Sequence, residues 1–197
     1  MSHHIYHTDG LILQCAPLAE ANLWLTILTR DLGLVQATAQ GVRTMNSKLR
    51  FALHDLSVAK LSFVLGKGAW KVTSAIPQES IYFQLKAQKF KLQTLLQVFK
   101  ALRRLVTGEE ENKALFSLLE KYYQFLVAEN LDQEEVKLSE YVILLRVLHN
   151  LGYVDQDELI GGFTSHSDWN KELLLALKPA RKQVAVIINQ ALHESQL

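Results

Sequence analysis

Residues 34–40 read Leu34-Val35-Gln36-Ala37-Thr38-Ala39-Gln40, a stretch in which apolar and polar side chains alternate. This period of two is typical of a β-strand that has one buried face and one face in water. Other short runs rich in β-branched and aromatic residues lie on both sides of it, separated by glycines and polar turns. The stretch therefore predicts one wall of a small β-barrel.

Five strands are predicted around this wall, over residues 5–15, 23–29, 34–40, 56–65 and 69–76. A basic connection over residues 41–54, with a short helix at 47–53, separates the third strand from the fourth. Three strands, a helical connection and two more strands is the order of the OB-fold, which binds oligonucleotides and oligosaccharides. The first part of the chain therefore predicts an OB-fold barrel.

From residue 82 onward, apolar residues recur every three or four positions, as in amphipathic helices. Helices are predicted over residues 82–106, 112–128, 133–151 and 180–193, with shorter helical segments near 155–160 and 168–177. Gly108 and Gly152 are predicted to cap helix ends, and Asp132 to start a helix. The chain thus predicts an α+β protein, with a five-stranded OB-fold barrel in residues 1–80 and an all-helical domain in residues 81–197.

The composition narrows the class of protein. The 197 residues are 49% hydrophobic and 21% charged, which is typical of a folded globular chain. Cys15 is the single cysteine, which excludes an internal disulfide framework and a cysteine-based zinc cluster and fits a reducing cytoplasm. No signal-peptide pattern or long apolar run is present, so we expect a cytoplasmic protein without a membrane anchor.

The strongest candidate for a functional segment is the basic connection after the third strand. Arg43, Lys48 and Arg50 lie within eight residues that contain no carboxylate. Cations and backbone amides of such a loop can contact phosphates, which gives salt-sensitive binding without sequence preference. Lys67 and Lys71, at the next chain reversal, would extend this patch if the barrel brings the two loops together. The alternative interpretation is a solvated loop.

The first predicted long helix has a basic stripe without an acid. When the chain is wound at 3.6 residues per turn, one sector contains Lys86, Lys89, Gln93, Gln97, Lys100 and Arg104. The opposite side is apolar except for Lys91, whose amine must snorkel or face a gap. We interpret Lys86 and Lys89 as DNA contacts and Lys100 and Arg104 as contacts to a partner. A solvated helix face is the alternative.

The sequence offers little for catalysis. The segment Gly66-Lys67-Gly68 lacks the spacing of a phosphate-binding P-loop, and no Gly-x-Ser-x-Gly motif occurs. We interpret His3, His4 and His7 as a terminal tail, with a metal site as the alternative, and Cys15 as a small buried group, with a nucleophile as the alternative. Trp24, Trp70 and Tyr82 are interpreted as core aromatics, and base-stacking platforms are the alternative. The chain is therefore predicted to be a non-enzyme without metal or cofactor.

Several motifs of the chain occur together in a known pattern. They are Tyr6-His7-Thr8-Asp9-Gly10-Leu11-Ile12-Leu13, Glu20-Ala21-Asn22, Leu28-Thr29-Arg30-Asp31-Leu32-Gly33-Leu34, Gly41-Val42-Arg43 with Ser47-Lys48-Leu49, and Leu144-Leu145-Arg146-Val147-Leu148 through Leu151-Gly152-Tyr153. Together they resemble one family, the bacterial recombination and repair mediator RecO. The resemblance covers nearly all of the predicted barrel and, more thinly, the helical half.

The resemblance implies a protein without catalytic activity that binds single- and double-stranded DNA and anneals complementary strands. It also implies action with RecR and with the acidic C-terminal tail of the single-strand binding protein SSB, so that RecA is loaded indirectly, in a cytoplasmic, nucleoid-associated setting. The cations for the tail are expected from the stripe Lys86, Lys89, Lys100 and Arg104, with Lys100 and Arg104 as the assigned contacts, or from Arg146 on a neighbouring helix.

Two positions depart from the family pattern. Gln40 occupies the place of a usual lysine, which shifts phosphate contacts to Arg43, Lys48 and Arg50. Residues 154–170 contain no cysteine where many relatives have a four-cysteine zinc module, so we expect folding without zinc. An OB-type RNA-binding module and a protein-binding adaptor remain alternative functions.

Overall fold

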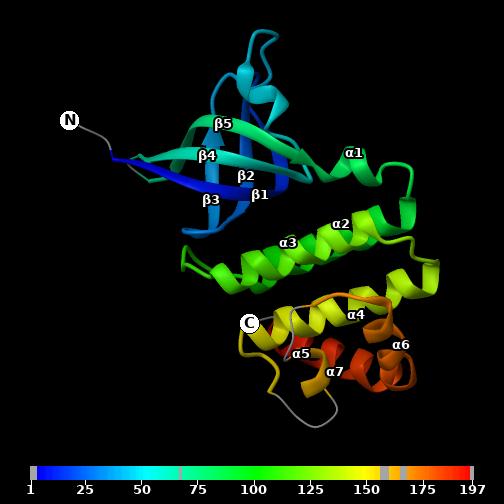
Figure 1. The fold of residues 1–197 in the computed structure, drawn as a ribbon. Coiled ribbons are helices and arrows are strands. Elements are labelled where there is room, and N and C mark those ends of the chain that lie inside the picture. Colours follow the sequence, from blue (N-terminus) through cyan, green and yellow to red (C-terminus); the bar gives the residue numbers. More distant parts are fainter. Residues whose placement is uncertain (1–3, 67, 156–159, 165–167, 196–197) are drawn as a thin grey trace. The chain divides into compact units, whose positions relative to one another are not determined.

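The computed structural model describes residues 4–66, 68–155, 160–164 and 168–195 (Figure 1). The chain divides into two compact units. The barrel unit comprises Met1–Gln84 and Thr107–Lys113, and the helical unit comprises Leu85–Val106 and Ala114–Leu197. That residues 1–80 and 81–197 form separate domains stays a prediction.

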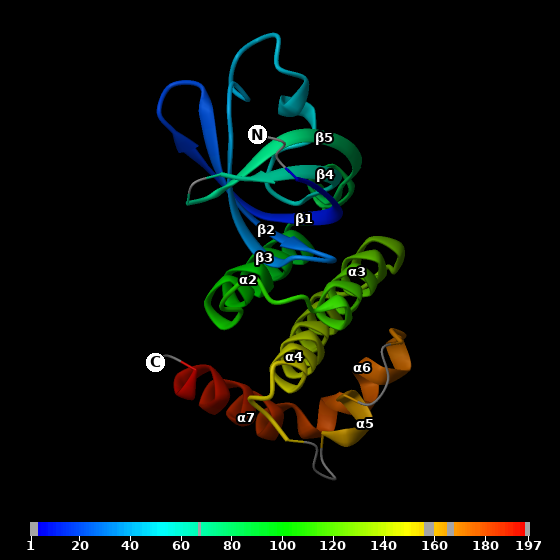
Figure 2. The same cartoon turned by 90° about the vertical axis from the view of Figure 1, so that its left-hand side faces the viewer.

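The barrel unit contains five strands that close into a barrel in the order β1-β2-β3-β5-β4 (Figures 1 and 2). Neighbouring strands are antiparallel except β3 and β5, which pair in parallel. The predicted OB-like barrel and the α+β class are confirmed. The strands are β1 Ile5–Leu18, β2 Asn22–Thr29, β3 Gly33–Ala39, β4 Ser57–Leu65 and β5 Trp70–Ser80.

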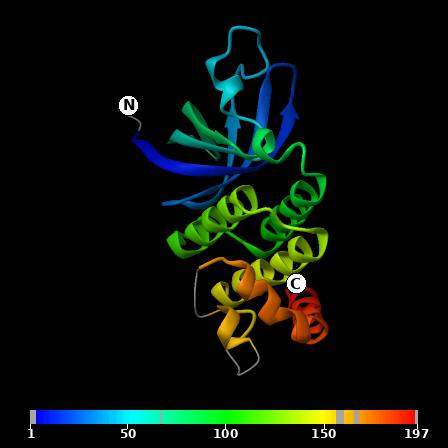
Figure 3. The same ribbon diagram turned by 45° about the vertical axis from the view of Figure 1, so that its right-hand side comes forward.

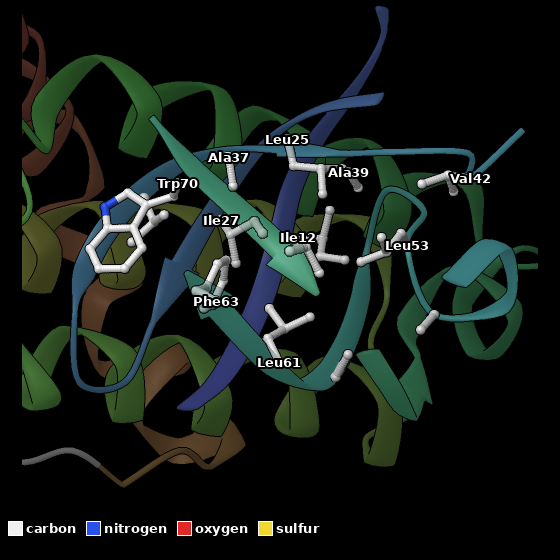
Figure 4. Close-up of a cluster of buried hydrophobic side chains, with 14 residues drawn as sticks. Ile12, Leu25, Ile27, Ala37, Ala39, Val42, Leu53, Leu61, Phe63 and Trp70 are labelled. Atoms are coloured by element: carbon white, nitrogen blue, oxygen red, sulfur yellow. The ribbon is translucent and has the colours of Figure 1, made fainter. Parts of the chain in front are cut away.

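The alternation in β3 sets which side chains face the core. Val35, Ala37 and Ala39 are fully buried, whereas Gln36 and Gln40 are exposed. They pack with inward residues of the other strands, including Ile12, Leu25, Ile27, Leu61, Phe63 and Trp70 (Figure 4). The predicted wall is therefore a wall of the barrel core.

Gly10 lies where the two strand pairings of β1 overlap. Residues 5–11 of β1 pair with β4, and residues 10–18 pair with β2. A Cβ atom at Gly10 would lie 2.5 Å from Leu61 Cδ1 and 2.9 Å from Ile27 Cγ2. Because real Cβ atoms do not approach other atoms so closely, a side chain here would push the core apart.

The helical unit is built around α4, which packs against α2, α5, α6 and α7 (Figure 3). Residues 142–148 of α4 are all buried, as expected for a helix surrounded by others. The helices are α2 Lys89–Leu105, α3 Lys113–Ala128, α4 Gln133–Asn150, α5 Gly161–Thr164, α6 Lys171–Leu177 and α7 Arg181–Glu194, with a short 3-10 helix η2 at Lys178–Ala180. Within the described ranges, no helix has the length and apolar content needed to cross a membrane.

Three sequence predictions about helices are wrong in part. The helix predicted over 82–106 is two helices, α1 Ile81–Leu85 and α2, because a turn in which Gln88 N donates to Leu85 O separates them. The helix predicted at 47–53 is a single 3-10 turn, η1 Lys48–Phe51. Gly108 has a φ of 88° but lies in the loop beyond Val106, so it does not cap α2. The segment predicted at 155–160 lies largely outside the described residues.

Two predicted caps of α4 are confirmed. Asp132 accepts from Glu135 N, while Glu135 accepts from Asp132 N, which is a capping box. At the other end Gly152 has a φ of 77°, and Tyr153 N donates to Leu148 O. Together with the bond from Gly152 N to His149 O, this is a Schellman motif. The Leu151-Gly152-Tyr153 motif therefore has a structural cause.

Candidate nucleic-acid interface

The basic connection between β3 and β4 is anchored to the barrel by its apolar residues. Val42, Ala52 and Leu53 are buried in the barrel core. Arg43, and Lys48 and Arg50 on η1, are exposed. The connection therefore presents its cations to solvent while buried neighbours fix its course beside the β1–β2 turn (Figures 2 and 3).

Hydrogen bonds join this connection to the β1–β2 turn. Arg43 N donates to Ala21 O at 3.0 Å, and Arg43 Nη1 donates to Ala19 O at 3.2 Å. Gly41, with a φ of 64°, donates its N–H to Asn22 Oδ1 at 3.0 Å. The β1–β2 turn therefore holds Arg43 through the carbonyls of Ala19 and Ala21, and the side chain of Asn22 holds the neighbouring Gly41.

The outer face of the barrel beside this connection carries one aligned row of side chains. Thr38 on β3 pairs with Trp24 on β2 and with Lys71 on β5. Register partners point to the same side of a sheet, and the neighbours of Thr38 on β3 face the core. Trp24, Thr38 and Lys71 therefore lie on the outer face of β2, β3 and β5, which includes the strands that OB-folds use for oligonucleotides.

The core interpretation of Trp24 is wrong, as is that of Tyr82, which is 45% exposed. The sequence interpretation puts Trp24 in the core, but it is half-buried on the outer face, since its neighbour Leu25 points inward. The signal is present in the sequence, because Leu23, Leu25 and Ile27 form the inward set of β2 and leave Trp24 opposite. Trp70 is 6% exposed and contacts the rings of Tyr6 and Phe63, so its core placement is confirmed.

The remaining predicted DNA contacts are scattered. Lys67 lies outside the described residues. Lys86 lies in the turn between α1 and α2, so it does not share a helical stripe with the others. Lys89 is exposed at the first position of α2. Both Lys86 and Lys89 belong to the helical unit.

The helical unit contains a cleft of about 810 Å³ between α2 and α7. Lys100 and Arg104 line it from α2, one turn apart, and apolar atoms of Leu105 and Leu192 lie beside them. The lining residues include no carboxylate. They are Gln97, Lys100, Ala101, Arg104, Leu105, Asn189, Leu192, His193 and Ser195.

Arg146, the alternative partner contact, is not a surface cation. It is 3% exposed, its Nε donates to Phe163 O at 2.7 Å, and its Nη2 donates to Asp168 O at 3.1 Å. Its guanidinium lies 4.7 Å from the centre of the Trp169 ring. Burial lowers the pKa of Arg146 to about 10. These contacts hold Phe163, Asp168 and Trp169 against α4, so we leave Arg146 out of the candidate site.

Two other ionisable groups are buried for structural reasons. Lys91 lines a cavity of about 260 Å³, as the sequence interpretation allowed, and its ammonium donates to Leu126 O at 2.8 Å and to Glu129 O at 2.5 Å, at the C-terminal end of α3. Burial lowers the pKa of Lys91. Burial and the nearby Asp55 carboxylate raise the pKa of Cys15, which disfavours the nucleophilic thiolate.

The sequence predicts no metal site. Across the described ranges, His, Cys, Asp and Glu side chains form no group of three that could hold an ion. His3 lies outside these ranges, so independence from metal stays a prediction.

Comparison with known proteins was made on the sequence. A family model described as Recombination protein O N terminal matches residues 1–81. The DNA repair protein RecO of Thermodesulfovibrio yellowstonii is 29% identical over 154 residues, covering 76% of this chain and 58% of that protein. The DNA repair protein RecO of Synechococcus sp. is 31% identical over 156 residues, covering 77% of this chain and 53% of that protein.

The protein of the same name from Frankia casuarinae is 32% identical over 151 residues, covering 76% of this chain and 60% of that protein. The alignments therefore extend beyond the barrel into the helical unit. The chain spans between 53% and 60% of the length of these three relatives.

Proposed function

Because the chain belongs to the RecO family of DNA repair proteins, we propose that it is a non-enzymatic mediator of recombination and repair. In this role it binds single- and double-stranded DNA, promotes annealing and helps to load RecA together with RecR and SSB in the cytoplasm, in association with the nucleoid. The observation that carries the proposal is the anchored, exposed connection with Arg43, Lys48 and Arg50 and no carboxylate.

The DNA path we propose follows the outer face of the barrel. Phosphates contact Arg43, Lys48 and Arg50 at the connection and Lys71 on β5, and Trp24 offers a ring beside Thr38. Because β3 ends at Ala39, Thr38 lies only three residues before Gly41, where the basic connection begins. Phosphate contacts of this kind give affinity with little sequence preference. Lys67, and separately Lys86 and Lys89 of the helical unit, stay proposed DNA contacts outside this path.

A fluorescence titration with labelled single-stranded DNA at several salt concentrations tests this path. The double variant Arg43→Glu/Lys48→Glu should bind much more weakly, and its salt slope should fall by about 1.4, since each phosphate contact to single-stranded DNA contributes roughly 0.7. The matched control is Lys60→Glu/Lys182→Glu, which changes the net charge equally at two exposed lysines outside the path. Equal affinity and slope in the folded double variant would refute the path.

We extend the proposal to the SSB tail. An acidic tail with an apolar end requires cations for its carboxylates and an apolar surface for its end. The α2–α7 cleft supplies Lys100 and Arg104 beside Leu105 and Leu192. This cleft, and not the region of Arg146, is therefore the proposed tail site.

The same titrations separate the alternative functions. Equal or tighter binding to RNA of the same length would favour an RNA-binding module. Failure to bind either nucleic acid would favour a protein-binding adaptor and would contradict the proposed function.

A further inference from the structure

Exposed aromatic rings lie in the barrel unit where the chain leaves β5. Tyr82 and Phe83 on α1 are 45% and 61% exposed, and their ring centres lie 5.6 Å apart in a T-shaped arrangement. The ring of His54, from the connection before β4, lies 6.5 Å from Phe83 and is also edge-on. We call these three residues the aromatic step. Tyr82, interpreted from sequence as core, is therefore at the surface.

The aromatic step is held in place by its neighbours and not by its own burial. Ile81 is fully buried, and its N–H donates to Leu56 O at 2.9 Å. Ser57 Oγ donates to His54 O at 2.7 Å, which fixes the backbone at His54. The barrel therefore positions α1 through Ile81, while about half of each of the side chains Tyr82 and Phe83 stays exposed to solvent. Large exposed apolar groups that lie together are typical of binding surfaces.

The charges near the aromatic step indicate the kind of occupant. Residues 42–54, which end at His54, contain Arg43, Lys48 and Arg50 and no carboxylate. Two acids lie nearby: Asp55, next to His54, is exposed and accepts a hydrogen bond from Cys15 N, and Glu79 is exposed near the end of β5, three residues before Tyr82. The three cations outnumber them. Phe51, between Arg50 and His54, is 72% exposed. An occupant that offers both flat apolar faces and negative charge complements this surface.

We propose that the aromatic step stacks unpaired nucleobases of a DNA strand whose phosphates contact Lys48 and Arg50. This inference rests on the proposed function and deepens it, because it adds base contacts at a place away from the outer face of β2 and β3. Aromatic side chains bind bases of any sequence by stacking, and arginine adds to such binding. Bases inside a duplex are already stacked on each other, so the step favours single strands.

The test uses the full chain and two DNA probes, a single strand that contains 2-aminopurine and a duplex of the same length. Phe83→Ala should weaken single-strand binding about tenfold, by the usual loss of one stacked base, and should leave the duplex affinity unchanged. The salt slope should stay as in the unaltered protein, since no phosphate contact is lost. The quenching of 2-aminopurine fluorescence on binding should also fall.

Conservative variants and a control make the test specific. Phe83→Trp and Tyr82→Phe keep flat rings and should keep single-strand affinity, whereas Tyr82→Ala should lose it. Leu175→Ala on α6, also an exposed apolar position, should change nothing. Melting temperatures establish that each variant folds.

Three outcomes would overturn the inference. In the first, Phe83→Ala and Tyr82→Ala bind the single strand and quench 2-aminopurine as the unaltered protein does, while Arg43→Glu/Lys48→Glu still weakens binding. The proposed function would then stand, but the aromatic step would have no part in it. In the second, Phe83→Ala or Tyr82→Ala weakens duplex binding and single-strand binding to the same extent. The third is an unaltered protein that binds neither probe, which would refute the proposed function as well.

Discussion

At the scale of single residues, Lys91 illustrates how a cation on an apolar helix face can serve the fold. Its side chain is 3% exposed, and its ammonium donates to two carbonyls at the end of α3, where helices leave acceptors without partners. A cation at a helix C-terminus is also favoured by the helix dipole. We infer that Lys91 joins α2 to α3 and has no direct part in DNA binding.

Replacing Lys91 by methionine tests this role. We expect Lys91→Met to lower the free energy of unfolding by about 1–3 kcal/mol, because Leu126 O and Glu129 O lose their donor in a buried place. Urea denaturation followed by circular dichroism measures the change. Lys89→Met, at an exposed position of the same helix, should stay within about 0.5 kcal/mol. A Lys91→Met variant as stable as the unaltered protein would refute the structural role. It would mean that burying the ammonium costs as much free energy as its hydrogen bonds contribute.

The residues that carry the family resemblance in the barrel also have structural roles. Gly33 has a φ of 69°, and a Cβ atom there would clash with Glu110 O of the loop that belongs to the same unit. Thr29 donates to Gly33 O and accepts from Leu32 N. Thr8 donates to Asp31 at 2.7 Å, which ties β1 to the same turn. These motif residues therefore stabilise the turns of the barrel, and the barrel carries the exposed cations of the basic connection.

At the scale of elements, two helices create the proposed tail site. Lys100 and Arg104 project from α2, and Leu192 and His193 belong to α7, far later in the chain. α2 supplies the cations and Leu105, and α7 supplies Leu192, so the cleft needs both helices.

A peptide of the SSB tail should therefore bind the helical unit of the full chain. Calorimetry at low salt should detect binding that weakens as salt rises, because its charge pairs are near the surface. Lys100→Glu/Arg104→Glu should abolish it, and removal of the last apolar residue of the peptide should remove most of it. Lys60→Glu serves as a control for charge. The absence of heat or competition with the full tail would refute the site.

At the scale of the whole molecule, the chain lacks the cysteines with which many relatives are expected to bind zinc. The segment after the Schellman motif at Gly152 contains no cysteine, and Arg146 fastens part of it by donating to Phe163 O and Asp168 O. We infer that these hydrogen bonds and the contact between Arg146 and Trp169 stabilise the fold of this segment, as a bound zinc ion stabilises a fold in other proteins.

Chelation should accordingly leave the protein unchanged. We expect EDTA to shift the melting temperature by less than the error of the measurement and elemental analysis to find no stoichiometric zinc, since structural zinc contributes folding free energy directly. A substantial fall in melting temperature on chelation would reveal a missed site, and variants of His3, His4 and His7 would then locate it.

The sequence by itself determined the barrel, the helical half and both caps of α4. These features depend on local patterns: a period of two buries alternate residues of a strand, and capping side chains bond to a backbone only a few residues away. The same patterns identified the acid-free segment around Arg43, Lys48 and Arg50. They failed at Lys86, where the apolar spacing runs through a turn that breaks the helix.

Only the tertiary structure decided which of these side chains meet solvent. Trp24 and Trp70 both lie in strands, yet the first faces outward and the second enters the core. Lys100 and Arg146 both lie on helices, yet α4 is covered by four helices, so Arg146 is buried while Lys100 lines a cleft. The physical reason is that burial depends on segments far apart in the sequence, whose packing a local pattern does not encode.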